Sequence, residues 1–428
     1  MKAKTAALAA LLALGGLPLL VAQAPAQPPQ PAAAPRPLAF SRAERDTISA
    51  LQAAVLGGDR VAQDTSLAAA RTAAQSADAR YAVAHYQFEI ARSRGDGPMR
   101  TQAIDAMVAS GLAQPSELPA FLTDQAERAY SAGDANRADQ LMQRAVEIQP
   151  NNPVLLTDAA QMRARIGSAY ARARRTQEAQ GAYQDAARLL QHAIELREAG
   201  GVPAPESWYQ RAIAIAYDNR LAPQTVSIGR ALVAAYPTPM NWRDALLTYK
   251  SVAPVDPTLD FDIRRLMRAS QALAGEGDYL DFATALNAAG QVGEAKAVLD
   301  EGVARGMLVA TKPVVAQLST AINRRLAADR ASLVRIPAPA PGAAAGPVLR
   351  SAADRLFGYG RYAEAVPLYR TALQNGGEDP NLVNSRLGAA LALAGQRAEA
   401  EVALRAVTGP RADLAGFWLA WLARRPVA

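Results

Sequence analysis

The residue types that most often carry catalysis or bind metals are scarce in this chain. It has no cysteine, and its only histidines are His85 and His192. Neither lies near a second histidine or a carboxylate pair at the spacing that a metal site requires. We therefore expect both histidines to pack between helices or to lie on the surface. Without cysteine, the chain also lacks disulfides and thiolate nucleophiles.

Paired carboxylates occur at Asp260/Asp262 and Glu276/Asp278, close to predicted helix starts. A carboxylate there satisfies free backbone N–H groups and the positive end of the helix dipole. A glycosidase would need two carboxyl groups facing each other across a cleft, and nothing in the sequence indicates that arrangement. Neither a G-x-x-x-x-G-K-S/T motif nor a G-x-S-x-G motif is present. The sequence thus predicts no enzymatic activity, no cofactor and no metal site.

The composition favours helices and a mixed surface. Half of the 428 residues are hydrophobic but only 6% are aromatic, because alanine, the strongest helix former, supplies almost half of the hydrophobic residues. The formal net charge is +7. Acidic and basic residues alternate along the chain, which indicates a solvated surface and not the basic stripe of a nucleic-acid binder. We expect no binding to nucleic acid.

The first residues have the pattern of a secretory signal peptide, assigned to 1–24. A basic start precedes an apolar run over 6–14, and small residues follow at Ala22, Ala24 and Ala26. Cleavage after Ala24 fits the pattern, and cleavage after Ala22 or Ala26 is also compatible with it. An uncleaved N-terminal anchor is the alternative. We expect a periplasmic or secreted protein that has no membrane contact apart from this signal peptide.

A short motif recurs near the C-terminal end of the chain. The pattern G-x-x-A-E-A begins at Gly360 and again at Gly395, 35 residues later. Each copy opens an amphipathic helix, and each is preceded by another helix. In the helix before Gly395, the small Gly388 lies between Leu387 and Leu391 on one face, which would let two paired helices approach closely. Such self-similarity at a fixed period is typical of helical repeat proteins.

Four units of this kind, 119–152, 276–309, 346–380 and 381–409, resemble the tetratricopeptide repeat family. The resemblance implies an all-α fold, a right-handed α-solenoid of helix hairpins. Helical periodicity alone predicts two longer helices over 154–199 and another hairpin over 79–112.

The sequence predicts five segments in order: a signal peptide (1–24), a Pro/Ala-rich tether (25–37), an N-terminal solenoid (38–335), a Pro/Ala/Gly linker (336–347) and a C-terminal pair of repeats with a capping helix (348–428). The last helix carries an apolar stripe at Leu414, Phe417, Trp418, Trp421 and Leu422. We expect it to cover the last repeat. Docking to a partner and lying at a membrane surface are the alternatives, the latter because Arg424 and Arg425 follow.

In tetratricopeptide proteins the first helix of each pair lines a concave binding surface. The resemblance therefore implies a set of exposed partner-binding candidates, namely Thr123, Glu127, Tyr130, Thr284, Asn287, Arg350, Asp354 and Phe357. These positions lack the lysine and asparagine clamp that some members use for a C-terminal carboxylate.

The leading hypothesis is a non-enzymatic scaffold that binds an envelope protein or peptide of unknown identity. The alternative is an accessory protein that handles glycan in cell-wall or exopolysaccharide assembly or export. That alternative depends on aromatic stacking by Trp208, Trp242 and Tyr279. An enzyme with an unrecognised active site is a third class, which no motif supports.

Overall fold

The computed structural model describes residues 37–334 and 345–423. These residues form twenty α-helices and one short 3-10 helix, and none of them lies in a β-strand. They divide into two compact units, one before and one after the bond between Gln114 and Pro115. The predicted signal peptide and most of the predicted tether and linker lie outside the described residues.

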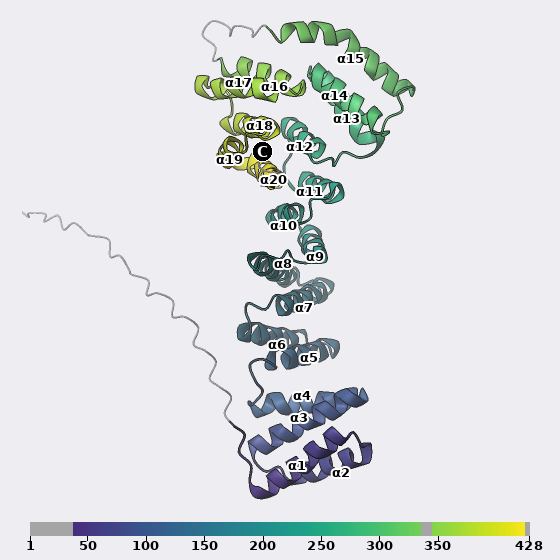
Figure 1. The fold of residues 1–428 in the computed structure, drawn as a ribbon, viewed down its shortest axis with the longest axis vertical. Helices are drawn as coiled ribbons and strands as arrows, with labels where there is room; N and C mark the ends of the chain where they lie inside the picture. Colours follow the sequence, from purple (N-terminus) through teal and green to yellow (C-terminus); the bar gives the residue numbers. More distant parts are fainter. Residues whose placement is uncertain (1–36, 335–344, 424–428) are drawn as a thin grey trace, which may run out of the picture. The chain divides into compact units, whose positions relative to one another are not determined.

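The first unit contains two helix pairs, with bounds α1 (Arg42–Gly57), α2 (Arg60–Ala73), α3 (Ala77–Arg94) and α4 (Gly97–Ser110) (Figure 1). Each helix packs against its partner, and α1 and α2 also pack against α3. Their shared core contains Leu51, Leu67 and Ile90. Gly95, at the end of α3, has a φ of 68°, a left-handed conformation that glycine adopts without steric cost.

Glu44 connects the start of α1 with the turn between α2 and α3. Its carboxylate accepts the backbone N–H of Ser41 at 2.8 Å, completing a capping box. It also accepts the N–H groups of Gln75 at 3.0 Å and Ser76 at 2.7 Å. The bond from Ser76 and then that from Ser41 lower the pKa of Glu44 to about 2. A single carboxylate therefore satisfies N–H groups of two separate chain segments.

The second unit contains the remaining helices, α5 (Leu118–Ser131), α6 (Ala135–Ile148), α7 (Pro153–Arg172), α8 (Thr176–Ala199), α9 (Glu206–Asp218), α10 (Ala222–Ala235), α11 (Pro239–Val252), α12 (Pro257–Ala269), α13 (Gly275–Ala288), α14 (Val292–Ala304), α15 (Pro313–Ser332), α16 (Gly346–Gly358), α17 (Tyr362–Asn375), α18 (Pro380–Leu393), α19 (Arg397–Arg405), η1 (Gly409–Arg411) and α20 (Ala412–Ala423). Consecutive helices pack in pairs, most extensively α5 with α6 and α7 with α8. The four units that resemble tetratricopeptide repeats correspond to α5–α6, α13–α14, α16–α17 and α18–α19. The predicted repeat of helix hairpins and the all-α solenoid are confirmed.

Helices α10 to α20 form a closed circuit of packed neighbours. The last helix, α20, packs against α18 and α19 and also against α10, where the circuit closes (Figure 1). The ring of Phe417 lies 5.8 Å from that of Tyr249 and 6.3 Å from that of Trp242, between centroids. The indole of Trp421 donates to the carbonyl of Ala269 at 3.2 Å. The C-terminal repeats therefore dock on α10–α12.

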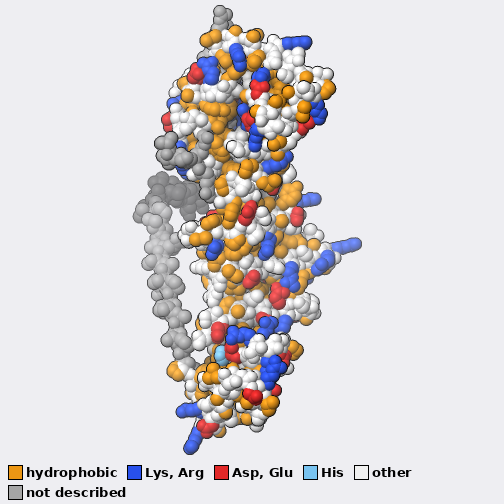
Figure 2. Space-filling model, turned by 45° about the vertical axis from the view of Figure 1, so that its right-hand side comes forward, with side chains coloured by type: hydrophobic (Ala, Val, Ile, Leu, Met, Phe, Trp, Pro, Cys, Tyr) orange, Lys and Arg blue, Asp and Glu red, His pale blue; other side chains and the backbone are white. Residues whose placement is uncertain are grey.

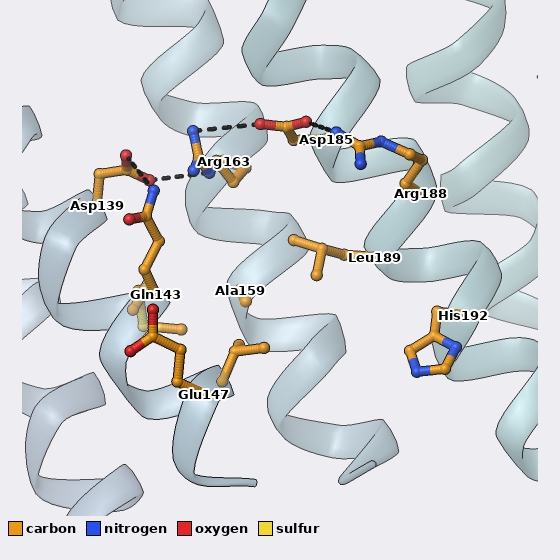
Figure 3. A pocket seen from close by; sticks show the side chains of 11 residues that line it. Asp139, Gln143, Glu147, Ala159, Arg163, Asp185, Arg188, Leu189 and His192 are labelled. Atoms are coloured by element: carbon orange, nitrogen blue, oxygen red, sulfur yellow. Dashed lines mark hydrogen bonds and ion pairs between the residues drawn. The ribbon is translucent and has the colours of Figure 1, made fainter. Parts of the chain in front are cut away.

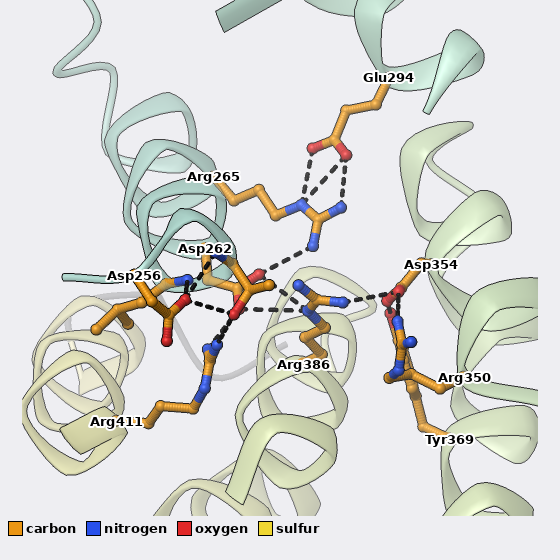
Figure 4. A network of polar contacts seen from close by, with 11 residues as sticks. Asp256, Asp262, Arg265, Glu294, Arg350, Asp354, Tyr369, Arg386 and Arg411 are labelled. Carbon is orange, nitrogen blue, oxygen red and sulfur yellow. Dashed lines mark hydrogen bonds and ion pairs between the residues drawn. The ribbon is translucent and has the colours of Figure 1, made fainter. Parts of the chain in front are cut away.

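Six charged side chains are buried where α12, α14, α16, α18 and η1 meet (Figure 4). They are three arginines and three carboxylates, so their charges balance: Asp262, Arg265, Glu294, Asp354, Arg386 and Arg411. Arg386 pairs with Asp262 at 3.0 Å and with Asp354 at 2.7 Å. Arg411 reaches Asp262 at 2.7 Å.

The expectation that Asp262 serves a helix start is therefore wrong. Asp262 is 3% exposed and is an acceptor for three arginines from different parts of the chain. Burial opposes its ionisation, but Arg386, Arg265 and Arg411 together outweigh burial and keep the pKa of Asp262 below its usual value. Its neighbour Asp260 does lie in the first turn of α12, and Lys250 and Arg264 pair with it.

Candidate functional site

An open groove crosses three consecutive helices of the second unit. It has a volume of about 440 Å³ and is lined by α6, α7 and α8 (Figure 3). The second helices of two successive pairs, α6 and α8, form its walls, and α7 forms its floor. A groove of this size falls within the range of ligand sites.

The floor of the groove is formed by apolar residues that are almost completely buried. Ala159 of α7 and Met142 of α6 are each 3% exposed. Val146 and Leu189 are half-buried on the two walls. Since Ala159 has no side chain beyond Cβ, α7 leaves an unfilled channel between the larger side chains of its neighbours. The apolar surface that remains accessible in the groove therefore comes mainly from Val146 and Leu189.

A row of charged residues runs along one side of the groove, as Figure 3 shows. Arg163 of α7 lies between two carboxylates, 2.8 Å from Asp139 of α6 and 3.5 Å from Asp185 of α8. Arg188 pairs with Asp185 from the outer side. Burial, with a contribution from Asp185, raises the pKa of Asp139, although Arg163 opposes the shift. The row thus contains two guanidiniums for two carboxylates, so its charges balance.

Glu147 and His192 lie at the opposite side of the groove from this row. Both are exposed, and within the described part of the chain neither forms an ion pair. They come from different walls, and no serine, threonine or lysine that could act as a nucleophile lines the groove. Among residues 37–334 and 345–423, no group of three or more His, Asp or Glu side chains could hold a metal ion. The geometry is suited to binding.

The structure brings two predicted site residues, Glu127 and Tyr130, together on α5. Arg165 of α7 pairs with Glu127 at 2.6 Å, and its guanidinium lies 4.1 Å from the centroid of the Tyr130 ring. The Tyr130 hydroxyl donates to the carbonyl of Arg165 at 3.0 Å. Thr123 lies one turn of α5 before Glu127 and two turns before Tyr130, and its hydroxyl donates to the carbonyl of Pro119. Arg165 thus already occupies Glu127 and Tyr130, and the groove lies on other helices.

The predicted residues of α13 are accessible. Thr284 is exposed, and Asn287 is half-buried. Asn287 accepts hydrogen bonds from Arg325 of α15, at 2.7 Å to its carbonyl and 3.1 Å to its side-chain oxygen. Because α15 packs against α13, part of this helix face is occupied by the chain itself.

The prediction that Asp354 and Phe357 are exposed partner-binding residues is wrong. Asp354 is 1% exposed and Phe357 is 5% exposed. Asp354 accepts from Arg386 and from the Tyr369 hydroxyl, both at 2.7 Å. Because the circuit closes over this face of α16, α12 and α18 cover what would be an open surface in a linear array. Of the three predicted residues on α16, only Arg350 is half-buried, and it pairs with Asp354 and with Glu378.

The aromatic residues expected to stack on glycan are mostly buried. Trp242 is 2% exposed, and Tyr279 is fully buried. Trp208 is half-buried and packs on the core of α9 and α10. Two of the three side chains are therefore inaccessible to a sugar.

The groove on α6–α8 has no clear signal in the sequence. Its lining recurs at helical spacing, from Asp139 through Gln143 to Glu147 and from Asp185 through Leu189 to His192. Charged, apolar and polar residues alternate along both walls, so neither helix has an unusually hydrophobic outer face. Ala159 is no clearer signal, because another alanine, Ala160, follows it directly in an alanine-rich chain.

The surface of the described chain carries mixed charges, with Lys and Arg interspersed among Asp and Glu on the face shown in Figure 2. None of the described helices combines the length and the apolar character needed to cross a bilayer.

No protein-family model matches the sequence, and no curated protein matches it. Among solved structures, the chain is similar to a tetratricopeptide repeat protein from Parabacteroides merdae, with 12% identity over 72% of this chain and 100% of that one, at a TM-score of 0.23. It is also similar to BtubC (BKLC) from P. vanneervenii, with 14% identity over 71% of this chain and 97% of that one, at the same TM-score. At such TM-scores neither similarity carries a conclusion about ligands, partners or activity. The description of this chain as a repeat of helical hairpins follows from its own structure.

Proposed function

We propose that this protein is a non-enzymatic scaffold that binds a segment of another protein in the groove on α6–α8. The observation that carries the proposal is the uncovered apolar surface of Val146 and Leu189 beside charged side chains of the same groove. A peptide or helix with two or three apolar side chains would remove the half-buried Val146 and Leu189 from water, and the gain in stability would be in proportion to the apolar area covered. Catalysis has no support from the groove's residues.

The charges of the groove favour a basic segment. Its walls carry three carboxylates, those of Asp139, Glu147 and Asp185, against two guanidiniums. Arg163 and Arg188 already pair with Asp139 and Asp185, whereas Glu147 pairs with no other described residue. A lysine or arginine of the partner would pair with Glu147, and the apolar side chains next to it would cover the apolar surface of the groove.

A display library of random 12-residue peptides, selected on the full-length protein, tests this function. We expect enrichment of peptides that combine Leu, Ile, Met or Phe with Lys or Arg. Glu147→Lys should weaken the selected peptides by at least about tenfold, because it exchanges an attraction for a repulsion. Asp218→Lys makes the same charge change at an exposed position of α9 outside the groove and should leave affinity unchanged.

Two outcomes would overturn the assignment to this groove. The first is a selection that enriches no sequence pattern. The second is a set of peptides that Glu147→Lys and the wild type bind equally well, with both proteins equally helical by circular dichroism.

The envelope location belongs to the same proposal and is supported by the signal-peptide pattern of residues 1–24. Fractionation of cells that express the tagged chain, with the mature N-terminus sequenced, tests it. Glycan handling is the alternative function, and the half-buried Trp208 is the aromatic residue that supports it. If the protein binds polysaccharide fragments and Trp208→Ala abolishes that binding, the alternative replaces the peptide groove.

A further inference from the structure

A second cavity, which the proposed function does not use, lies among α12, α14, α15, α16 and α17. Its volume is about 320 Å³, and its lining is predominantly polar. Three of the lining residues are cations, Arg268 of α12, Lys296 of α14 and Arg330 of α15, and one is a carboxylate, Asp300 of α14. Two tyrosines, Tyr359 and Tyr362, complete the set of polar side chains. We refer to it as the basic pocket.

The shape of the basic pocket depends on close packing between α14 and α16. A Cβ atom at Gly293 would lie 2.5 Å from the ring of Tyr359, and one at Gly358 would lie 2.9 Å from Cβ of Glu294. Both distances are shorter than van der Waals contact, so glycine is required for the two helices to approach. The Tyr359 hydroxyl then donates to Asp329 at 2.6 Å, which holds its ring at the wall of the pocket.

The three cations of the basic pocket differ in the ion pairs that they form with other residues of the protein. Arg268 is held by Glu301 at 2.6 Å. Lys296 pairs with Asp300 within one helix, and the Asp300 side chain is 60% exposed, so this pair stabilises the fold by little and can be exchanged. Arg330 forms no ion pair with any described residue, and its guanidinium lies 5.9 Å from the centroid of the Tyr359 ring. Two cations from different helices therefore face the pocket with replaceable partners or none.

Tyr362 adds a neutral donor. Its side chain is half-buried, and its hydroxyl forms no hydrogen bond within the described ranges. Burial raises the pKa of Tyr362, so the hydroxyl keeps its proton at neutral pH and can donate it to an anion.

We propose that the basic pocket binds the phosphate group of a small phosphorylated ligand, with Arg330 and Lys296 contacting the oxygens and Tyr362 donating a hydrogen bond. A phosphate monoester carries up to two negative charges and three acceptor oxygens, which match two cations and one neutral donor. The volume exceeds that of a phosphate group alone and leaves space for the body of the ligand. This function is separate from peptide binding, because the pocket and the groove share no helix.

Isothermal titration of the full-length protein with glycerol 3-phosphate and with inorganic phosphate, at constant ionic strength, tests the proposal. We expect saturable binding of both compounds and none of acetate. Arg330→Ala and Lys296→Ala should each weaken binding by about tenfold or more, since each removes a charge-assisted hydrogen bond. Tyr362→Phe removes one oxygen atom without changing the packing and should weaken binding severalfold.

Arg324→Ala is the matched control, because Arg324 is an exposed arginine of the same helix outside the pocket and its loss changes the net charge equally. The proposal is overturned if neither phosphate compound binds saturably, or if acetate binds as tightly as phosphate. It is also overturned if Arg330→Ala and Arg324→Ala weaken binding to the same degree, which would indicate general electrostatic attraction.

Discussion

At the scale of single residues, glycines determine how closely neighbouring helices approach. A Cβ atom at Gly388 of α18 would lie 2.5 Å from Cγ of Leu404 on α19, and one at Gly167 of α7 would lie 2.9 Å from the ring of Tyr183 on α8. Leu404 is 1% exposed, so it has little freedom to move aside. The absence of a side chain on one helix is therefore what allows a large side chain on the other.

Gly388→Ala should consequently destabilise the protein. The added methyl group overpacks the contact with Leu404, at a cost of about 1–3 kcal/mol, and the better helix propensity of alanine recovers only part of this. Urea unfolding followed by circular dichroism measures the difference. Gly181→Ala is the control, since its Cβ would meet nothing within 4 Å, and we expect it to be neutral or stabilising. Equal effects of the two substitutions would contradict this explanation.

At the scale of an element, α20 shows how one apolar helix is used. Leu414, Phe417, Trp418 and Leu422 are each at most 2% exposed, and the helix contacts α10, α18 and α19. The apolar stripe is thus covered by the protein itself. These side chains are not exposed to a membrane surface or to a partner, although the sequence alone was compatible with both.

Phe417→Ala should therefore lower the free energy of unfolding by about 3–5 kcal/mol, the usual cost of truncating a fully buried phenylalanine. The loss arises because Phe417 contacts the rings of Trp242 and Tyr249 on α11. Val402→Ala, at a position 72% exposed on α19, should change stability by less than about 0.5 kcal/mol. A small effect of Phe417→Ala in thermal unfolding would indicate that α20 does not close the circuit in solution.

At the scale of the second unit, the buried charges connect segments that are distant in the chain. Asp262 of α12 pairs with Arg386, 124 positions later, and with Arg411, 149 positions later. Burying these ions costs solvation energy, which their mutual attraction offsets only when every partner is present. The network therefore favours one specific arrangement of the C-terminal repeats on α12.

Asp262→Asn should reduce stability at neutral pH by about 3–5 kcal/mol, because it leaves buried arginines without their shared carboxylate. The folded-state pKa of Asp262 lies below its unfolded value, so its contribution is present above the unfolded pKa, about 4, and is lost as the pH falls below it. The stability difference between wild type and variant should therefore narrow below pH 4. Denaturant titrations from pH 7 to pH 3 measure the free energy of unfolding of both proteins. If the difference between them did not change with pH, the pKa of Asp262 would not be lowered in the folded protein.

Local patterns were sufficient for much of this fold. The spacing of Gly360 and Gly395, the alanine-rich faces and the turn glycines predicted the hairpins α5–α6, α13–α14, α16–α17 and α18–α19, because helix formation and hairpin packing depend on residues close in sequence. The same local information located Glu127 and Tyr130 on one helix face. It could not show that Arg165 of the following hairpin already occupies that face.

Residues close together in the chain were enough to predict a repeat of helical hairpins with no recognisable catalytic motif. Which faces of those hairpins are open depends on contacts between distant segments, and these are visible only in the folded structure. The packing of α12 and α18 against α16 buries Asp354 and Phe357, and the packing of α20 against α11 buries Trp242. Asp262, expected at a helix start, lies at the centre of an ionic network. Such long-range contacts depend on the sum of small rotations between successive hairpins, which no local pattern specifies. The groove on α6–α8 and the basic pocket arise from those same rotations.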